Sequence, residues 1–167
     1  MNKPKNTNKI RIILSVIILL TVLIIWGHSF MTPEMSSEES SFVKEIVEAV
    51  VQSVSNNETF TIPEIVIRKS AHFFEYAVLG LELTILITVN KIEPLSDDKK
   101  RGLIKRVFFF YPTAFIFSLL VASLDETIQY FTGRYSSVWD VLLDMTGASF
   151  SILLFLLFRK LSLRRKK

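Results

Sequence analysis

The sequence contains no cysteine and only two histidines among its 167 residues. The lack of cysteine excludes disulfide bonds, thiolate metal sites and cysteine nucleophiles. The motifs of several common enzyme classes are also missing: there is no Ser-His-Asp spacing, no HExxH and no glycine loop of the kind that cradles phosphate. These absences favour a binding function over catalysis.

Apolar residues make up half of the chain, and the mean hydropathy is +0.39. Soluble domains are also about half apolar, so this composition alone does not decide the class of protein. Here the apolar residues stand in long blocks, which is typical of membrane spans. The length fits one domain, and we expect residues 1–167 to form a single transmembrane domain.

Four apolar blocks are long enough to cross the hydrocarbon core as helices, which takes about 20 residues each. The predicted spans cover residues 10–29, 65–89, 107–130 and 138–158. The first block follows a basic tail but does not end in the small residues of a signal-peptide cleavage site, so we expect an uncleaved anchor. The predicted fold class is therefore an all-α membrane protein with four transmembrane helices.

The basic residues predict the orientation, because short loops rich in Lys and Arg stay in the cytoplasm. Both tails are basic, and so is the segment between the second and third spans, with Lys91, Lys99, Lys100, Arg101, Lys105 and Arg106. The first and third loops contain almost no basic residues. We therefore expect a multi-pass membrane protein with both termini cytoplasmic. The net charge is +4, and the basic residues lie beside the apolar blocks. This position favours anionic lipid and argues against nucleic acid as a partner.

The first loop contains apolar residues at spacings of three and four between positions 41 and 54. This spacing predicts an amphipathic helix between the first two spans, on the extracellular side. It would lie on the outer leaflet or cap the bundle.

A further pattern in the fourth span concerns packing. Gly147 and Ser151 form a pair of small residues four positions apart. Such pairs let two helix backbones approach closely in a membrane. We therefore expect a tight helix contact at this position.

Charged and polar residues interrupt three of the four predicted spans. Such residues are costly in lipid and usually face the interior of a bundle or a water-filled cavity. Spacings of three and four residues recur among them, so residues of one span share a helix face. The candidates are Arg68, Lys69, His72 and Glu75 on the second span, Asp125, Glu126 and Gln129 on the third, Arg134 in the last loop, and Asp140 and Asp144 on the fourth.

The predicted orientation places these residues at matching depth, in the outer half of the membrane. Even Glu75 would lie only about 15 Å below Ile65 along the helix axis, near the midplane. We interpret the ten residues as one outward-facing ligand-binding cluster. The alternative is a set of structural ion pairs, although polar contacts between membrane helices contribute only about 0.6 to 2 kcal/mol each.

Three segments of the sequence resemble the VanZ-like family of small bacterial membrane proteins, named for a teicoplanin-resistance factor. The first runs from Arg68 to Tyr76 with Leu79-Gly80, the second is Asp125-Glu126-x-x-Gln129, and the third is Gly133-Arg134 followed by Asp140-Val141-x-x-Asp144-x-x-Gly147. The resemblance covers about residues 63–158. It implies a multi-pass membrane protein of Gram-positive bacteria that reduces susceptibility to glycopeptide antibiotics. It brings neither a settled mechanism nor a cofactor.

Three functions remain open. The first is a protein whose polar cluster binds an envelope lipid, a lipid-linked cell-wall precursor or the glycopeptide itself. The second is a membrane-embedded enzyme acting on such a precursor, with His72 as base or metal ligand and the carboxylates as acid–base or cation-binding groups. The third is a transporter, which four spans without an internal repeat would support only as a homo-oligomer. The first interpretation assigns no metal ligand and leaves any cofactor unknown. It also places His28, at the end of the first predicted span, outside the cluster.

Overall fold

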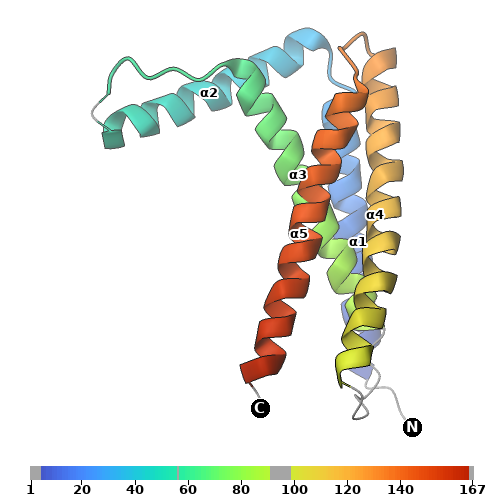
Figure 1. The fold of residues 1–167 in the computed structure, drawn as a ribbon. Helices are drawn as coiled ribbons and strands as arrows, with labels where there is room; N and C mark the ends of the chain where they lie inside the picture. Colours follow the sequence, from blue (N-terminus) through green and yellow to red (C-terminus); the bar gives the residue numbers. More distant parts are fainter. Residues whose placement is uncertain (1–4, 56, 91–98, 166–167) are drawn as a thin grey trace.

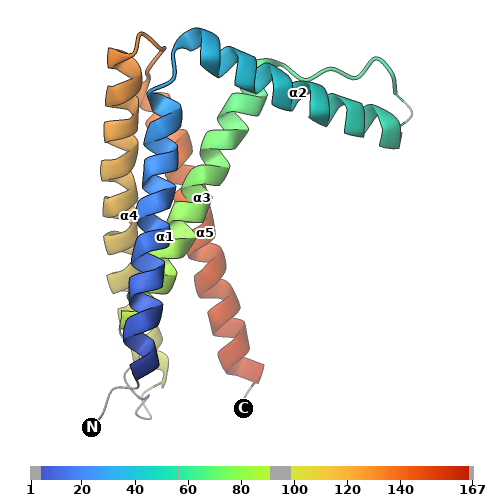
Figure 2. The same ribbon diagram turned by 180° about the vertical axis from the view of Figure 1, so that it is seen from behind.

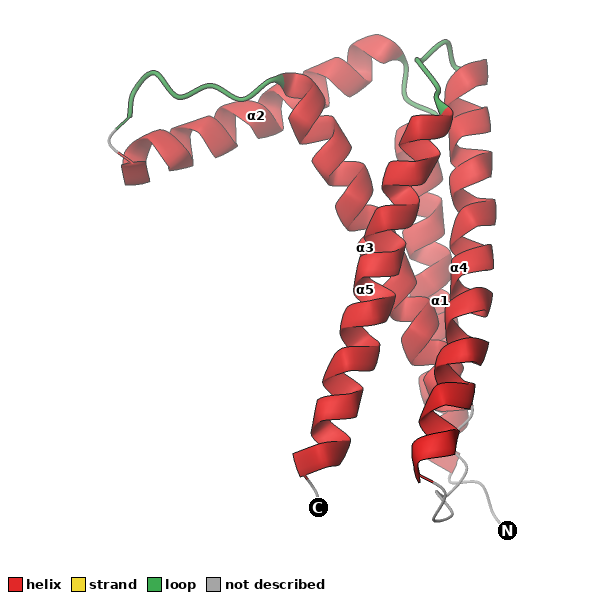
Figure 3. Ribbon diagram, in the orientation of Figure 1, coloured by secondary structure: helices red, strands yellow, loops and turns green. Residues whose placement is uncertain are grey.

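The computed structural model describes residues 5–55, 57–90 and 99–165, and this part of the chain contains helices and no strands (Figure 3). The helices are α1 (Lys5–Ser29), α2 (Pro33–Ser55), α3 (Glu64–Asn90), α4 (Lys99–Phe131) and α5 (Val138–Arg165). Four of them are long and apolar enough to cross a membrane. These candidate spans cover Thr7–Ser29, Glu64–Val89, Pro112–Phe131 and Val138–Ser162.

Helices α1, α3, α4 and α5 form a bundle, whereas α2 extends sideways from one end of it (Figures 1 and 2). We call this end of the bundle the α2 end. Helices α1 and α4 end there, and α3 and α5 begin there. The short connection between α4 and α5 also lies at this end. The opposite end contains the start of α1 and the end of α5.

The apolar residues of the bundle divide between its interior and its outer surface. Buried side chains from all four helices form one core, and they include Ile25, Tyr76, Ala122 and Ile152. Many large apolar side chains of the same helices instead lie on the outside, such as Leu23 at 53% exposure. An outer surface of this kind suits contact with lipid chains, which replace water around a membrane helix.

The predicted helix within the first loop begins earlier than the sequence pattern indicated. We expected it at residues 41–54, but α2 begins at Pro33. The local signals are a proline in the first turn, Glu34 beside it, and Thr32, whose hydroxyl accepts a hydrogen bond from the Met35 amide. Proline and an acid in the first turn are both favourable at a helix start. The apolar periodicity alone therefore missed the first two turns of this helix.

The spanning helices also continue beyond the predicted spans. We placed residues 99–106 in a basic loop, but α4 begins at Lys99 and includes them. Likewise α1 begins at Lys5 and α5 continues to Arg165, both within basic tails. Lys and Arg are good helix formers, so a helix continues after its apolar stretch has ended. Residues 91–98, including Lys91, lie outside the described residues.

A close helix contact joins α3 and α5 through two glycines. A Cβ atom added to Gly147 would lie 2.2 Å from the carbonyl oxygen of Phe73, and one added to Gly80 would lie 2.7 Å from the carbonyl oxygen of Ala148. Only glycine fits at such distances. The predicted packing role of Gly147 is confirmed, and the contact fixes the faces of α3 and α5 that carry the polar residues.

Candidate functional site

The end of α4 directs Arg134 back over the bundle. Gly133 has a φ of 79°, a left-handed conformation that glycine adopts without a steric penalty. The Gly133 amide donates to the Tyr130 carbonyl and the Arg134 amide to the Gln129 carbonyl, which is the Schellman arrangement of a helix end. In this position Arg134 Nη1 donates a hydrogen bond of 2.9 Å to the His28 carbonyl on α1.

The start of α5 is joined to α4 through Glu126. The Glu126 carboxylate accepts a hydrogen bond of 2.9 Å from the Ser137 amide, one of the first amides at the start of α5. The Ser137 hydroxyl in turn accepts from the Trp139 amide. Glu126 thereby satisfies a donor that would otherwise have no partner within the helix. This contact sets the position at which α5 enters the bundle, and with it the positions of Asp140 and Asp144.

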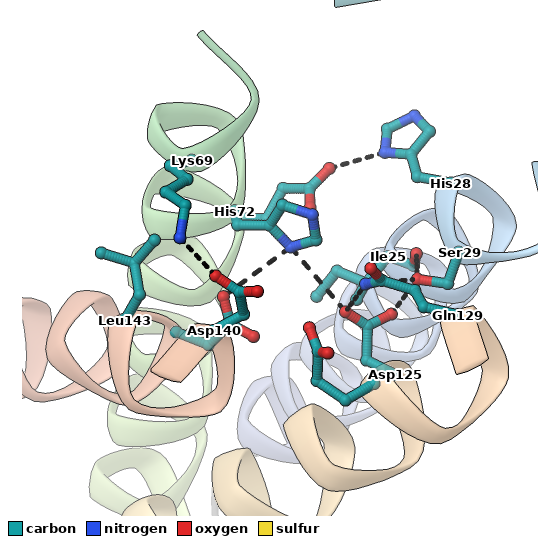
Figure 4. Close-up of polar contacts among 12 residues, drawn as sticks. Ile25, His28, Ser29, Lys69, His72, Asp125, Gln129, Asp140 and Leu143 are labelled. Atoms are coloured by element: carbon teal, nitrogen blue, oxygen red, sulfur yellow. Dashed lines mark hydrogen bonds and ion pairs between the residues drawn. The ribbon is translucent and has the colours of Figure 1, made fainter. Parts of the chain in front are cut away.

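Two carboxylates of the α2 end, those of Asp125 and Asp144, are fully buried. Figure 4 shows Asp125 beside Ser29 and Gln129. The Asp125 carboxylate accepts hydrogen bonds from the Ser29 hydroxyl and from Gln129 Nε2, the latter at 3.2 Å. The second carboxylate, Asp144, has no hydrogen-bond partner among the described residues. His72 Nδ1 lies between the two, 3.8 Å from Asp125 Oδ2 and 3.7 Å from Asp144 Oδ1.

Two further contacts surround this centre. Lys69 Nζ lies 2.6 Å from Asp140 Oδ1, which pairs α3 with α5. On the other side, His28 Nδ1 lies 2.6 Å from Glu75 Oε1, which pairs α1 with α3 (Figure 4). Both pairs are partly exposed, so solvent screening limits what each contributes to stability. Their geometric effect is to hold three helices around His72.

Among the cavities at the α2 end, two share part of their walls. The first has a volume of about 180 Å³ and is lined mainly by polar residues, including Arg68, Lys69, His72, Arg134 and Asp140. The second has a volume of about 320 Å³ and lies between α2 and α3. It shares Arg68, His72 and Arg134 with the first cavity, and its apolar wall consists of Val43, Val47, Ile67 and Phe74.

The shared wall of the cavities combines two guanidinium groups. Arg134 is half-buried, and its burial and the nearby charge of Arg68 lower its pKa from the usual value. Arg68 forms no hydrogen bond or ion pair with the described residues, although it lines both cavities. An anion between the two guanidinium groups would relieve their repulsion and accept their hydrogen bonds. The wall is therefore suited to a phosphate or carboxylate group.

The structure brings all ten residues of the predicted cluster to the α2 end. Arg68, Lys69, His72, Glu126, Gln129, Arg134 and Asp140 line the first cavity, Glu75 lines the second, and Asp125 and Asp144 lie beneath His72. Spacing along each helix had predicted their common face. Their functional role stays a prediction.

The exclusion of His28 from the cluster was wrong. His28 contacts Glu75 directly, lies 3.8 Å from Glu39 through Nε2, and provides the carbonyl that Arg134 binds. Sequence reasoning treated the end of the first span as an anchor and missed Ser29 as well. The available signal was that both polar residues end an apolar block at the depth predicted for the cluster.

One group of side chains has the composition of a metal site, which the favoured interpretation of the sequence did not assign and only the enzyme alternative named. His72, Asp125 and Asp144 each offer one ligand atom, and these atoms all lie within 4.8 Å of one another. An imidazole nitrogen and two carboxylates form a ligand set that divalent ions accept.

Comparison with known proteins identifies the family. The model of the VanZ/LLP1 family matches residues 13–159, which is most of the chain. No curated protein and no solved structure matches the chain. The chain therefore belongs to the VanZ/LLP1 family, and the resemblance found in its motifs is confirmed. It is a membrane protein of this family with four apolar helices.

Proposed function

We propose that this protein lies in a bacterial cell membrane with both termini in the cytoplasm and the α2 end facing outward. The distribution of Lys and Arg supports this orientation, because the basic tails belong to the end of the bundle opposite α2. In this orientation both cavities open at the outer leaflet. The exposed apolar residues of α2, among them Phe42, Ile46 and Val50, would then rest on lipid.

The orientation can be tested by labelling cysteines, since the natural chain has none. A cysteine in place of Ser55, which is exposed at the end of α2, should react with an impermeant reagent in intact cells. A cysteine in place of Ser96, in the basic segment outside the described residues, should react only after the cells are opened. The reverse pattern would refute the orientation and the outward position of the cavities.

The function that the cavities support best is binding of an anionic group at the outer leaflet. The family resemblance adds the proposal that this binding lowers susceptibility to teicoplanin. The observation behind the anion site is the shared wall, where Arg68 has no hydrogen-bond or ion-pair partner among the described residues and Arg134 lies beside it. Arg binds phosphate in bidentate fashion. The apolar wall of the second cavity would accept the adjoining part of a lipid chain. We infer that the ligand is either the drug itself or the headgroup of an envelope lipid or lipid-linked precursor.

Expression of this protein in a susceptible Gram-positive host should raise the inhibitory concentration of teicoplanin more than that of vancomycin. Teicoplanin carries an acyl chain that anchors it at the outer leaflet, the layer in which the cavities would open. A drug without that anchor would be less affected by a protein that occupies the layer. The measurement compares both inhibitory concentrations with those of a host carrying an empty vector. Equal protection against both drugs would refute the argument from the anchor.

A second candidate function is an enzyme that modifies a lipid or cell-wall precursor. The observation in its favour is His72, which lies between two buried carboxylates and also lines a cavity. Such a site offers a base and acids near a bound headgroup. Mass spectrometry of the lipid fraction before and after incubation with purified protein separates the two functions, because only an enzyme changes the mass of the lipid.

A further inference from the structure

The group formed by His72, Asp125 and Asp144 contains an unexplained buried carboxylate. Asp144 is 0% exposed, and neither of its oxygens has a hydrogen-bond partner among the described residues. His72 Nδ1, which points toward it, also lacks a hydrogen-bond partner. A buried charge without partners is strongly unfavourable, and native proteins nearly always satisfy such groups. Either a proton held among these groups or a bound cation would satisfy them.

The nearby cations do not meet this requirement. Lys69 is paired with Asp140, and Arg134 donates to the His28 carbonyl. Arg68 and Arg134 line the cavity above His72, whereas Asp144 lines neither cavity. Asp125 accepts hydrogen bonds from the Ser29 hydroxyl and from Gln129. Its Oδ2 atom nevertheless lies 3.8 Å from His72 Nδ1. Two carboxylates and one imidazole nitrogen therefore converge on a place that no Lys or Arg of the described residues fills.

We propose that His72 Nδ1, Asp125 and Asp144 bind one divalent transition-metal ion of the Zn²⁺ or Mn²⁺ type. This site does not depend on the proposed role in teicoplanin susceptibility. The imidazole favours these ions over Mg²⁺ and Ca²⁺, which prefer a shell made entirely of oxygen. Each of three helices contributes one ligand, so the ion would also join α3, α4 and α5 at the α2 end.

The observed spacing is close to what such an ion requires. With bonds of about 2.0 to 2.2 Å, neighbouring ligand atoms lie about 3.0 to 3.5 Å apart. The distances from His72 Nδ1 to the two carboxylates are 3.8 and 3.7 Å, a few tenths wider. All three ligand atoms lie within 4.8 Å of one another, so a bound ion would draw the side chains inward.

The surroundings match those of known metal sites in two respects. The Asp125 ligand is oriented by hydrogen bonds from Ser29 and Gln129, as the ligands of metal sites usually are. Three protein ligands leave coordination positions for water or a ligand. His72 also lines the cavity of about 180 Å³, which gives the site access to these molecules.

The test uses the full-length protein in detergent micelles, stripped with a chelator and then given Zn²⁺ or Mn²⁺ alone. After gel filtration, elemental analysis should find one ion per chain in the wild type and none in Asp144→Ala or His72→Ala. Glu82→Gln should retain the ion. The Glu82 carboxylate also lies on α3, but it accepts a hydrogen bond from Thr21 and is not one of the three proposed ligands. Thermal unfolding of the wild type should occur at a higher temperature with the ion than without it.

A spectroscopic measurement on the wild type covers the case in which a variant does not fold. Pulsed electron paramagnetic resonance of the Mn²⁺-loaded protein should show coupling to one imidazole nitrogen. A wild type that binds no ion would overturn the proposal and indicate that the two carboxylates share a proton instead. Binding without nitrogen coupling, or with full occupancy in Asp144→Ala, would overturn it as well.

Discussion

Replacing Gly147 by alanine is expected to destabilise the protein by about 3 kcal/mol or more, the upper end of what overpacking usually costs. The added Cβ would lie 2.2 Å from the Phe73 carbonyl oxygen and 3.3 Å from the Ala77 amide nitrogen, and its three nearest atoms all belong to the backbone, which cannot easily move aside. Alanine has a helix propensity about 1 kcal/mol better than glycine, which is too little to compensate. Thermal unfolding in detergent measures the difference.

Gly27 provides the matched control, because it also lies within a helix but an added Cβ there meets nothing within 4 Å. Gly27→Ala should therefore unfold at the wild-type temperature or slightly above it. Gly147→Ala should also displace α3 from α5 and so move His72 away from Asp144. If the two variants unfolded at the same temperature, the close contact between α3 and α5 would be wrong.

Much of this fold follows from sequence because membrane spans are long, apolar and separated by charged segments. The four candidate spans agree with the predicted blocks, and spacings of three and four residues placed His72, Asp125 and Asp144 on inward faces. The helix ends were less predictable. Periodicity does not register a start signal such as Thr32-Pro33-Glu34, or the continuation of α4 through its basic first turns.

The individual side-chain pairs that join different helices could not be predicted, because a single sequence does not show which faces of two spans lie against each other. His28 illustrates this, since its partner Glu75 lies 47 positions further along the chain. Ser29 and Asp125 are 96 positions apart. Their pairing depends on how α1 packs against α3 and α4, which is a property of the whole bundle.

Arg68→Gln is expected to remove protection against teicoplanin while leaving the protein folded and abundant in the membrane. Arg68 has no hydrogen bond or ion pair with the described residues, so its loss leaves no internal partner unsatisfied. The same change at Arg134 would be less informative, because it also removes the hydrogen bond to the His28 carbonyl. The inhibitory concentration for Arg68→Gln should fall to that of the host without the protein. Arg68→Lys should restore part of it, since it retains the charge but loses the bidentate geometry.

A loss of both function and membrane abundance in Arg68→Gln would instead indicate a structural role. Removing one partner of a buried ion pair typically costs about 3 to 5 kcal/mol and reduces the amount of folded protein. The unfolding temperature of the purified variant separates the two explanations. We expect it to match that of the wild type.

The claim that the cavities bind an anionic lipid headgroup is tested most directly by the lipid that the purified protein retains. Wild type and Arg68→Gln are expressed in the same Gram-positive host, purified in the same mild detergent and analysed by native mass spectrometry. The wild type should carry one phosphate-bearing lipid per chain, and Arg68→Gln should have lost most of it. Equal amounts of phosphate-bearing lipid on both proteins, or only neutral lipid on the wild type, would contradict the proposed site.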